Sequence, residues 1–157
     1  RHKFMATVQN KSREAQLYEE IDKNVKMGAD STVNLIGRLS DGELKTELGR
    51  ELAEYEALAH EAKTALFNMG ETPREEGFVT RMSAKMGVMM NTMLDSTPSH
   101  IAQMVIEGCA MGTSDLIKKV NECESASDGK TCREAKALAN RAVQFEEDCA
   151  EKMKAYL

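Results

Sequence analysis

The residues that could do chemistry are glutamates placed beside the apolar faces of two predicted helices. Glu107 follows Ile106 and Glu146 follows Phe145, and both lie at nearly equal distances from the middle of a loop predicted at Glu124–Lys130. If the flanking helices pair, the two carboxylates meet at one level. Carboxylates that meet inside a bundle repel each other, raise each other's pKa and attract a cation. One interpretation is therefore a metal site, for iron or another divalent metal.

The predicted second helix supplies the other candidate ligands. It offers Glu51 and Glu54 at that level if the chain turns at Pro98, and His60 if the chain only kinks there. His100 lies one heptad before Glu107 and is a candidate outer ligand. The spacing favours the four glutamates over the two histidines as metal ligands.

A second interpretation needs no metal. Glutamates beside an apolar stripe commonly extend their carboxylates to water, and Glu107 can form a local hydrogen bond instead. His60 and His100 can be ordinary helix residues. No nucleophile–base pair can be assembled from the serines and cysteines by helical spacing, and no glycine-rich phosphate loop follows a strand. The sequence therefore favours a protein that is not an enzyme and implies no cofactor firmly.

Sulfur-containing residues are frequent, with four cysteines and eleven methionines. The cysteines form no Cys-x-x-Cys pair, and we expect four separate thiols, two of them buried as small apolar residues. Many methionines recur at helical spacing before Pro98. Such a stripe could contact copper(I) or haem, but it is more typical of an adaptable core, or of a groove that accepts a partner's helix.

Composition predicts one helical domain over residues 1–157, with residues 1–11 a flexible tail. The chain has only two prolines, no tryptophan, and no segment that alternates with the strand period of two. Its net charge of −5 is mixed along the sequence and provides no basic patch for nucleic acid. No apolar run approaches the ~20 residues that span a membrane. Without a visible signal peptide, a cytoplasmic location is predicted.

Helix signals divide the first half of the chain. A first helix is predicted from about Ser12 to Leu39, and Gly28 on its apolar stripe indicates close approach by a neighbouring helix. The segment Ser40–Glu43 resembles a capping box that starts a second helix, and Gly70 is placed to end it. The short connection predicts that these two helices are antiparallel neighbours.

The second half begins with a methionine-rich helix, from a capping box at Thr72–Glu75 to about Leu94, and restarts at Thr97-Pro98. In the helix that follows, Gly108 and Gly112 are expected to face a neighbouring helix closely. The last helix is predicted to start at a capping box, Thr131–Glu134. The predicted fold is an all-α antiparallel four-helix bundle with an additional methionine-rich crossover helix.

Two hairpins joined by a long crossover resemble the ferritin-like superfamily. The segment Ser96–Gly112, with its Ser-x-x-Ser-His-Ile-Ala start, also resembles uncharacterised small bacterial helical-bundle proteins. The first resemblance implies a bundle that could hold iron. Ferritin-like di-iron sites use Glu-x-x-His pairs, whereas Glu56 and His60 are four apart and the predicted last helix has no histidine.

These observations predict a non-catalytic helical-bundle protein that binds a partner protein or a second copy of itself. The alternative is a degenerate ferritin-like protein that binds a metal with carboxylates inside the bundle. Neither nucleic acid nor a membrane is an expected partner.

Overall fold

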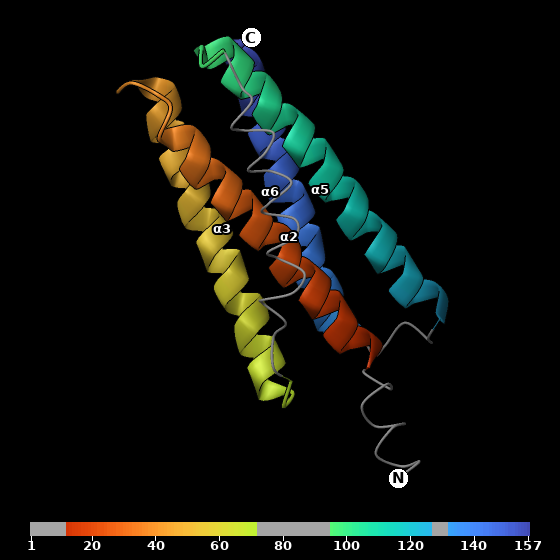
Figure 1. Cartoon of the computed structure of the whole chain (residues 1–157). Coiled ribbons are helices and arrows are strands. Elements are labelled where there is room, and N and C mark those ends of the chain that lie inside the picture. Colours follow the sequence, from red (N-terminus) through yellow and green to blue (C-terminus); the bar gives the residue numbers. More distant parts are fainter. Residues whose placement is uncertain (1–11, 72–94, 127–131) are drawn as a thin grey trace.

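The computed structural model describes residues 12–71, 95–126 and 132–157, and these form an all-helical bundle (Figure 1). The described ranges contain no strand. The helices are α2 (Arg13–Ile36), α3 (Glu43–Asn68), α5 (Pro98–Ala126) and α6 (Arg133–Met153), with a short 3-10 helix, η1 (Lys154–Tyr156), at the end. The predicted tail, the methionine-rich crossover helix and the predicted Thr72–Glu75 capping box lie outside the described residues.

The start of α2 agrees with the prediction. The Ser12 side chain caps the helix by accepting a hydrogen bond from the backbone N–H of Ala15 at 3.0 Å. The helix ends at Ile36 instead of Leu39. Beyond Ile36 the bonds join residues three apart, as in a 3-10 turn: the backbone N–H of Leu39 donates to the carbonyl of Ile36 at 3.2 Å.

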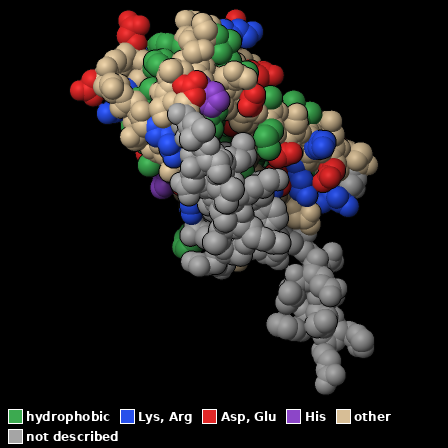
Figure 2. Space-filling model, turned by 45° about the horizontal axis from the view of Figure 1, so that its top comes forward, with side chains coloured by type: hydrophobic (Ala, Val, Ile, Leu, Met, Phe, Trp, Pro, Cys, Tyr) green, Lys and Arg blue, Asp and Glu red, His purple; other side chains and the backbone are tan. Residues whose placement is uncertain are grey.

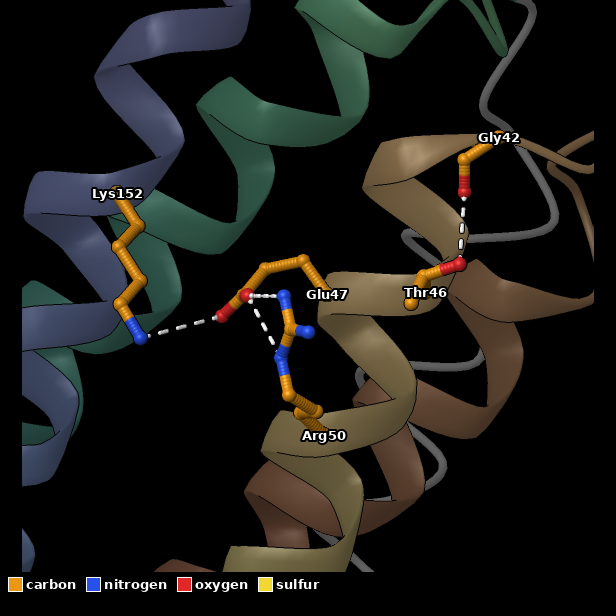
Figure 3. Close-up of polar contacts among 5 residues, drawn as sticks. All are labelled: Gly42, Thr46, Glu47, Arg50 and Lys152. Atoms are coloured by element: carbon orange, nitrogen blue, oxygen red, sulfur yellow. Dashed lines mark hydrogen bonds and ion pairs between the residues drawn. The ribbon is translucent and has the colours of Figure 1, made fainter.

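The start of α3 lies where it was predicted, but the predicted capping box is wrong. Gly42 is the N-cap residue and no side chain caps the helix. Instead, the hydroxyl of Thr46 donates back to the carbonyl of Gly42 at 3.1 Å (Figure 3). Ser40 and Glu43 therefore do not bond reciprocally, because Ser40 lies two residues before the cap.

The end of α3 is confirmed at Gly70. This glycine has φ +77°, a left-handed conformation that costs a residue without Cβ little. Its backbone N–H donates to the carbonyl of Phe67 at 3.0 Å, and that of Glu71 donates to the carbonyl of Leu66 at 2.9 Å. The two bonds satisfy carbonyls that the helix end would leave unpaired.

Helix α5 begins at Pro98, as predicted. The hydroxyl oxygen of Thr97 accepts a hydrogen bond from the backbone N–H of His100 at 3.3 Å. The backbone N–H of Thr97 in turn donates to the carboxylate of Asp95 at 2.9 Å. Proline fits the first helical position because its missing N–H would have no intrahelical partner there.

The junction between α5 and α6 corrects one prediction. Cys123 and Cys132 form a disulfide, so the four cysteines are not four separate thiols. Cys132 is the N-cap residue of α6 and makes no side-chain cap bond, while Thr131, the first residue of the predicted Thr131–Glu134 capping box, lies outside the described residues. Cys109 and Cys149 remain free and buried, which matches the expectation of two buried thiols.

The hydrophobic core consists of two clusters. The larger is built around Leu17, Leu58 and Leu116 and extends to the start of α6. The smaller contains Leu48 and Met153 and lies at the other end of the bundle, beside the start of α5. On the outside, acidic and basic side chains are interspersed over the face drawn in Figure 2. Several of the buried polar residues, among them Glu51 and Glu146, lie where the two clusters meet.

Candidate functional site

Polar side chains from all four helices are buried between the two apolar clusters, and we call them the polar layer. None of its members is more than 7% exposed. The polar layer consists of Asn24 from α2, Glu51 and Tyr55 from α3, Cys109 from α5, and Glu146 and Cys149 from α6.

Glu146 is one of the two carboxyl groups of the polar layer. The Tyr55 hydroxyl donates to its Oε2 at 2.9 Å, whereas Oε1 has no hydrogen-bond partner among the described residues. Burial raises the pKa of Glu146 to about 7 against the opposing effect of the Tyr55 bond, and Asp115 adds to the rise. The carboxyl group is therefore partly protonated near neutral pH.

Glu51 is the second carboxyl group, and it also has an unpartnered oxygen, Oε2. Burial, and after it the hydrogen bond to Glu47 and the charge of Glu47, raise the pKa of Glu51 to about 8, while Cys149 and Lys152 oppose the rise. Figure 3 shows Glu47 reaching from α3 toward Lys152 of α6, 3.7 Å away, with Arg50 beside it. Burial alone would raise the pKa of Glu47, but its bonds with Glu51 and Arg50 lower it. Of these two hydrogen-bonded carboxyl groups, Glu51 therefore favours the protonated form and Glu47 favours the ionised form.

The thiols of the polar layer are unreactive. Burial, and then the nearby Glu146 and Glu51, raise the pKa of Cys109 to about 12. Burial and Glu51 also raise the pKa of Cys149. A thiol must ionise to act as a nucleophile or a metal ligand. The raised pKa values therefore favour the neutral thiol form of both cysteines at physiological pH.

Two glycines make room for the polar layer. The Tyr55 ring lies directly over Gly28, where an added Cβ would overlap it, so the predicted close approach at Gly28 is confirmed. The same ring packs edge-on against Phe145 with centroids 4.8 Å apart. A Cβ added at Gly112 would lie 2.7 Å from Oε1 of Glu146. The carbonyl of Gly112 also accepts from the Asn24 amide at 2.9 Å.

The structure places the predicted metal ligands in different environments. Glu51 and Glu146 both lie in the polar layer. Glu54 is exposed, as are His60 and Glu107, and His100 is half-buried. The expectation that Glu107 is buried near Glu146 is therefore wrong.

A helical rotation explains the error at Glu107. It lies two residues before the buried Cys109, so at about 100° per residue it points to nearly the opposite side of α5. Its carboxylate accepts a hydrogen bond from the Gln103 amide at 3.3 Å, the local alternative expected for it. Among the described residues, no atom lies within 4 Å of the position that a Cβ would occupy at Gly108, whereas the predicted tight contact is confirmed at Gly112. The methionine-rich segment, the other expected neighbour of Gly108, lies outside the described residues.

The polar layer does not have the geometry of a preformed metal centre. Among the residues that the structure describes, no group of three or more His, Cys, Asp or Glu side chains could hold a metal ion as they stand. Two carboxyl groups and two thiols share the layer, but the thiols are protonated. A cation would have to displace protons and draw the side chains together.

A groove of about 450 Å³ lies at the end of the bundle where α3 stops and α6 starts. It is bounded by Glu14 and Tyr18 of α2, Glu134 of α6, and the last turns of α3 from His60 to Met69. Phe67 is 79% exposed and lies two helical turns after His60, on the same edge of α3. Sequence reasoning missed this groove, because it forms where three helix ends meet.

No protein-family model, curated protein or solved structure matches this chain. Within the described ranges, no helix combines the length and the apolar character that crossing a membrane requires.

Proposed function

We propose that this chain is a non-catalytic helical-bundle protein that binds a protein partner through the groove at the end of α3. The groove carries the proposal because it is the place where apolar and charged side chains meet in an open concave surface. The polar layer, by contrast, is closed to solvent and its thiols are neutral, which disfavours chemistry on a substrate.

We also propose an antiparallel, ferritin-like arrangement of the helices. Three observations support the antiparallel pairing. Early residues of α2 pair with late residues of α3, as in the Asp22–Lys63 ion pair at 3.0 Å. Arg141 in the first half of α6 binds Glu61 in the last part of α3. The disulfide joins the end of α5 to the start of α6.

Site-specific photo-crosslinking tests the binding proposal. A photoreactive phenylalanine analogue at Thr64, an exposed groove residue, should capture a protein partner in the source cells. The same group at Gln103, which is exposed on α5, is the matched control. Crosslinks at Gln103 but not at Thr64 would show that the groove is not the binding surface. Light scattering over a concentration series shows whether the partner is a second copy.

The second candidate function is metal binding inside the bundle, with iron or another divalent metal. The unpartnered oxygens of Glu51 and Glu146 favour it, because buried carboxyl oxygens without hydrogen bonds are costly. Elemental analysis after purification without chelators tests it directly. If metal is bound, a chelator should lower the melting temperature of the parent but not that of the E51Q/E146Q variant. If the purified protein contains no metal, and added metal does not change its melting temperature, this candidate function is excluded.

A further inference from the structure

The described lining of the groove at the end of α3 is rich in negative charge. Among the residues that the structure describes, this lining includes the carboxylates Glu14, Glu61 and Glu134 and one histidine, His60, but no lysine or arginine. Glu61 is neutralised by Arg141, which binds both carboxylate oxygens at 2.8 and 2.9 Å. Glu14 and Glu134 remain close to each other, and after burial the charge of Glu134 is the next cause that raises the pKa of Glu14.

Part of this charge has a structural role. The Glu14 carboxylate accepts a hydrogen bond from the backbone N–H of Ala135, so α2 caps the first turn of α6. Glu134 lies in that same first turn, where the helix dipole favours a negative charge. Neither interaction supplies a full positive charge, so the pair still attracts a cation.

The rest of the lining is suited to an aliphatic chain. Ala65 and Met69 of α3 are partly exposed on one side of the groove, and the ring of Tyr18 forms its base. Lysine and arginine bury their methylene stems along such surfaces while the charged group stays near water or a carboxylate. A small inorganic cation would gain nothing from this apolar wall.

We propose that the groove binds a lysine or arginine side chain from an apolar, basic segment of the partner protein, with Glu14 and Glu134 holding the cationic group. This inference rests on the proposed function and adds the chemistry of the partner. Apolar neighbours of the basic residue would cover Phe67 at the edge of the groove.

Peptide titration followed by two-dimensional NMR tests the inference. The probe is the blocked tetrapeptide Leu-Lys-Leu-Lys, and the control peptide has glutamate in place of lysine. The lysine peptide should shift the amide signals of Tyr18, Thr64 and Ala65, and leave that of Gln103 unchanged. The glutamate peptide should shift none of them.

Two double variants separate a specific site from a net-charge effect. E14Q/E134Q should weaken binding of the lysine peptide roughly fivefold or more, because two charges beside the bound cation are lost. E56Q/E107Q removes the same charge from exposed positions on α3 and α5, and should leave the affinity close to that of the parent. The amide oxygen of the introduced glutamine can still cap Ala135, and melting confirms that the variants fold.

Several results would overturn the inference. These are equal responses to both peptides, equal weakening in both double variants, or no shifts in the groove. Shifts of the same amides with protein concentration alone would show that a second copy occupies the groove. A partner that crosslinks at Thr64 but is insensitive to E14Q/E134Q would leave the proposed function standing while the basic-segment inference fails.

Discussion

The polar layer and the groove contain the same kind of residue in opposite states. In the layer, Glu51 and Glu146 are each 3% exposed and have pKa values raised to about 8 and about 7. In the groove, Glu61 has a pKa lowered by its hydrogen bond to Arg141. The difference comes from burial without a basic partner in the layer, against water and an arginine in the groove. The raised pKa values favour the protonated form of the two layer carboxyl groups, whereas the lowered pKa favours the charged form of Glu61.

The largest expected effect is a dependence of stability on pH that originates in the layer. Glutamate has an ordinary pKa of 4.5, so the raised values of Glu51 and Glu146 favour the folded state fully below pH 4.5. This stabilisation is lost as the pH rises through about 7 and about 8. We expect the free energy of unfolding to fall by on the order of 3 kcal/mol between pH 5 and pH 8.

Thermal melting across this pH range checks the prediction. The E51Q/E146Q variant should show a nearly flat profile and should be more stable than the parent at pH 8, because its amides have no proton to lose. The groove variant E14Q/E134Q should keep the parent's slope. If the slope survives in E51Q/E146Q, the layer is not its origin.

The next effect concerns the end of the bundle that contains the groove. The Cys123–Cys132 bond closes a short loop, with the two residues nine positions apart. Removing it in C123S/C132S should lower the free energy of unfolding by about 2.5 kcal/mol, through the greater freedom of the unfolded chain. Denaturant unfolding measures this loss. A reducing agent should reproduce it in the parent and have no effect on the variant.

The third effect is on the packing of the layer. In Gly28→Ala the added methyl group would overlap the Tyr55 ring, which cannot retreat because Phe145 packs against it. We expect a loss of about 1–3 kcal/mol in the free energy of unfolding. The Tyr55 hydroxyl should also lose its alignment with Glu146, so the pH profile should change along with the stability. An unchanged profile and melting temperature would contradict the placement of Tyr55.

The smallest effect is a gain at Gly108. No atom of the described residues lies within 4 Å of the position that a Cβ would occupy there. Gly108→Ala should therefore add helix propensity without a clash and stabilise the protein by up to about 1 kcal/mol. Gly112→Ala is the matched comparison, because its methyl group would press on the Glu146 carboxylate. Destabilisation by both substitutions would mean that Gly108 is also at a close contact.

Local signals explain which parts of the fold were predictable. Ser12, Pro98 and Gly70 mark helix ends through bonds within their own few residues, and the structure confirms all three. The predicted box at Ser40 has the right residue types, but the N-cap residue of that helix is Gly42 instead. A capping motif predicts the region in which a helix starts more reliably than it predicts the N-cap residue itself.

The site was only partly predictable. The sequence shows how far along a helix a residue lies more reliably than it shows which side of the helix the residue faces. Counting from the loop brought Glu146 to the right level, and its apolar neighbours indicated burial. The same reasoning failed for Glu107, which points away from the core. The discriminating feature is Gly112, which faces Glu146 and makes space for its carboxylate. The disulfide did have a signal, since Cys123 and Cys132 flank the predicted loop.

That disulfide bears on where the protein is made and kept. Disulfide bonds form and persist in secreted, periplasmic or other oxidising surroundings, while the reducing systems of a typical cytosol keep cysteines in the thiol form. Both sulfur-bearing residues are at most 4% exposed and pack into the larger apolar cluster, so folding encloses the bond. The Cys123–Cys132 bond is therefore one that oxidising surroundings would preserve and reducing surroundings would oppose.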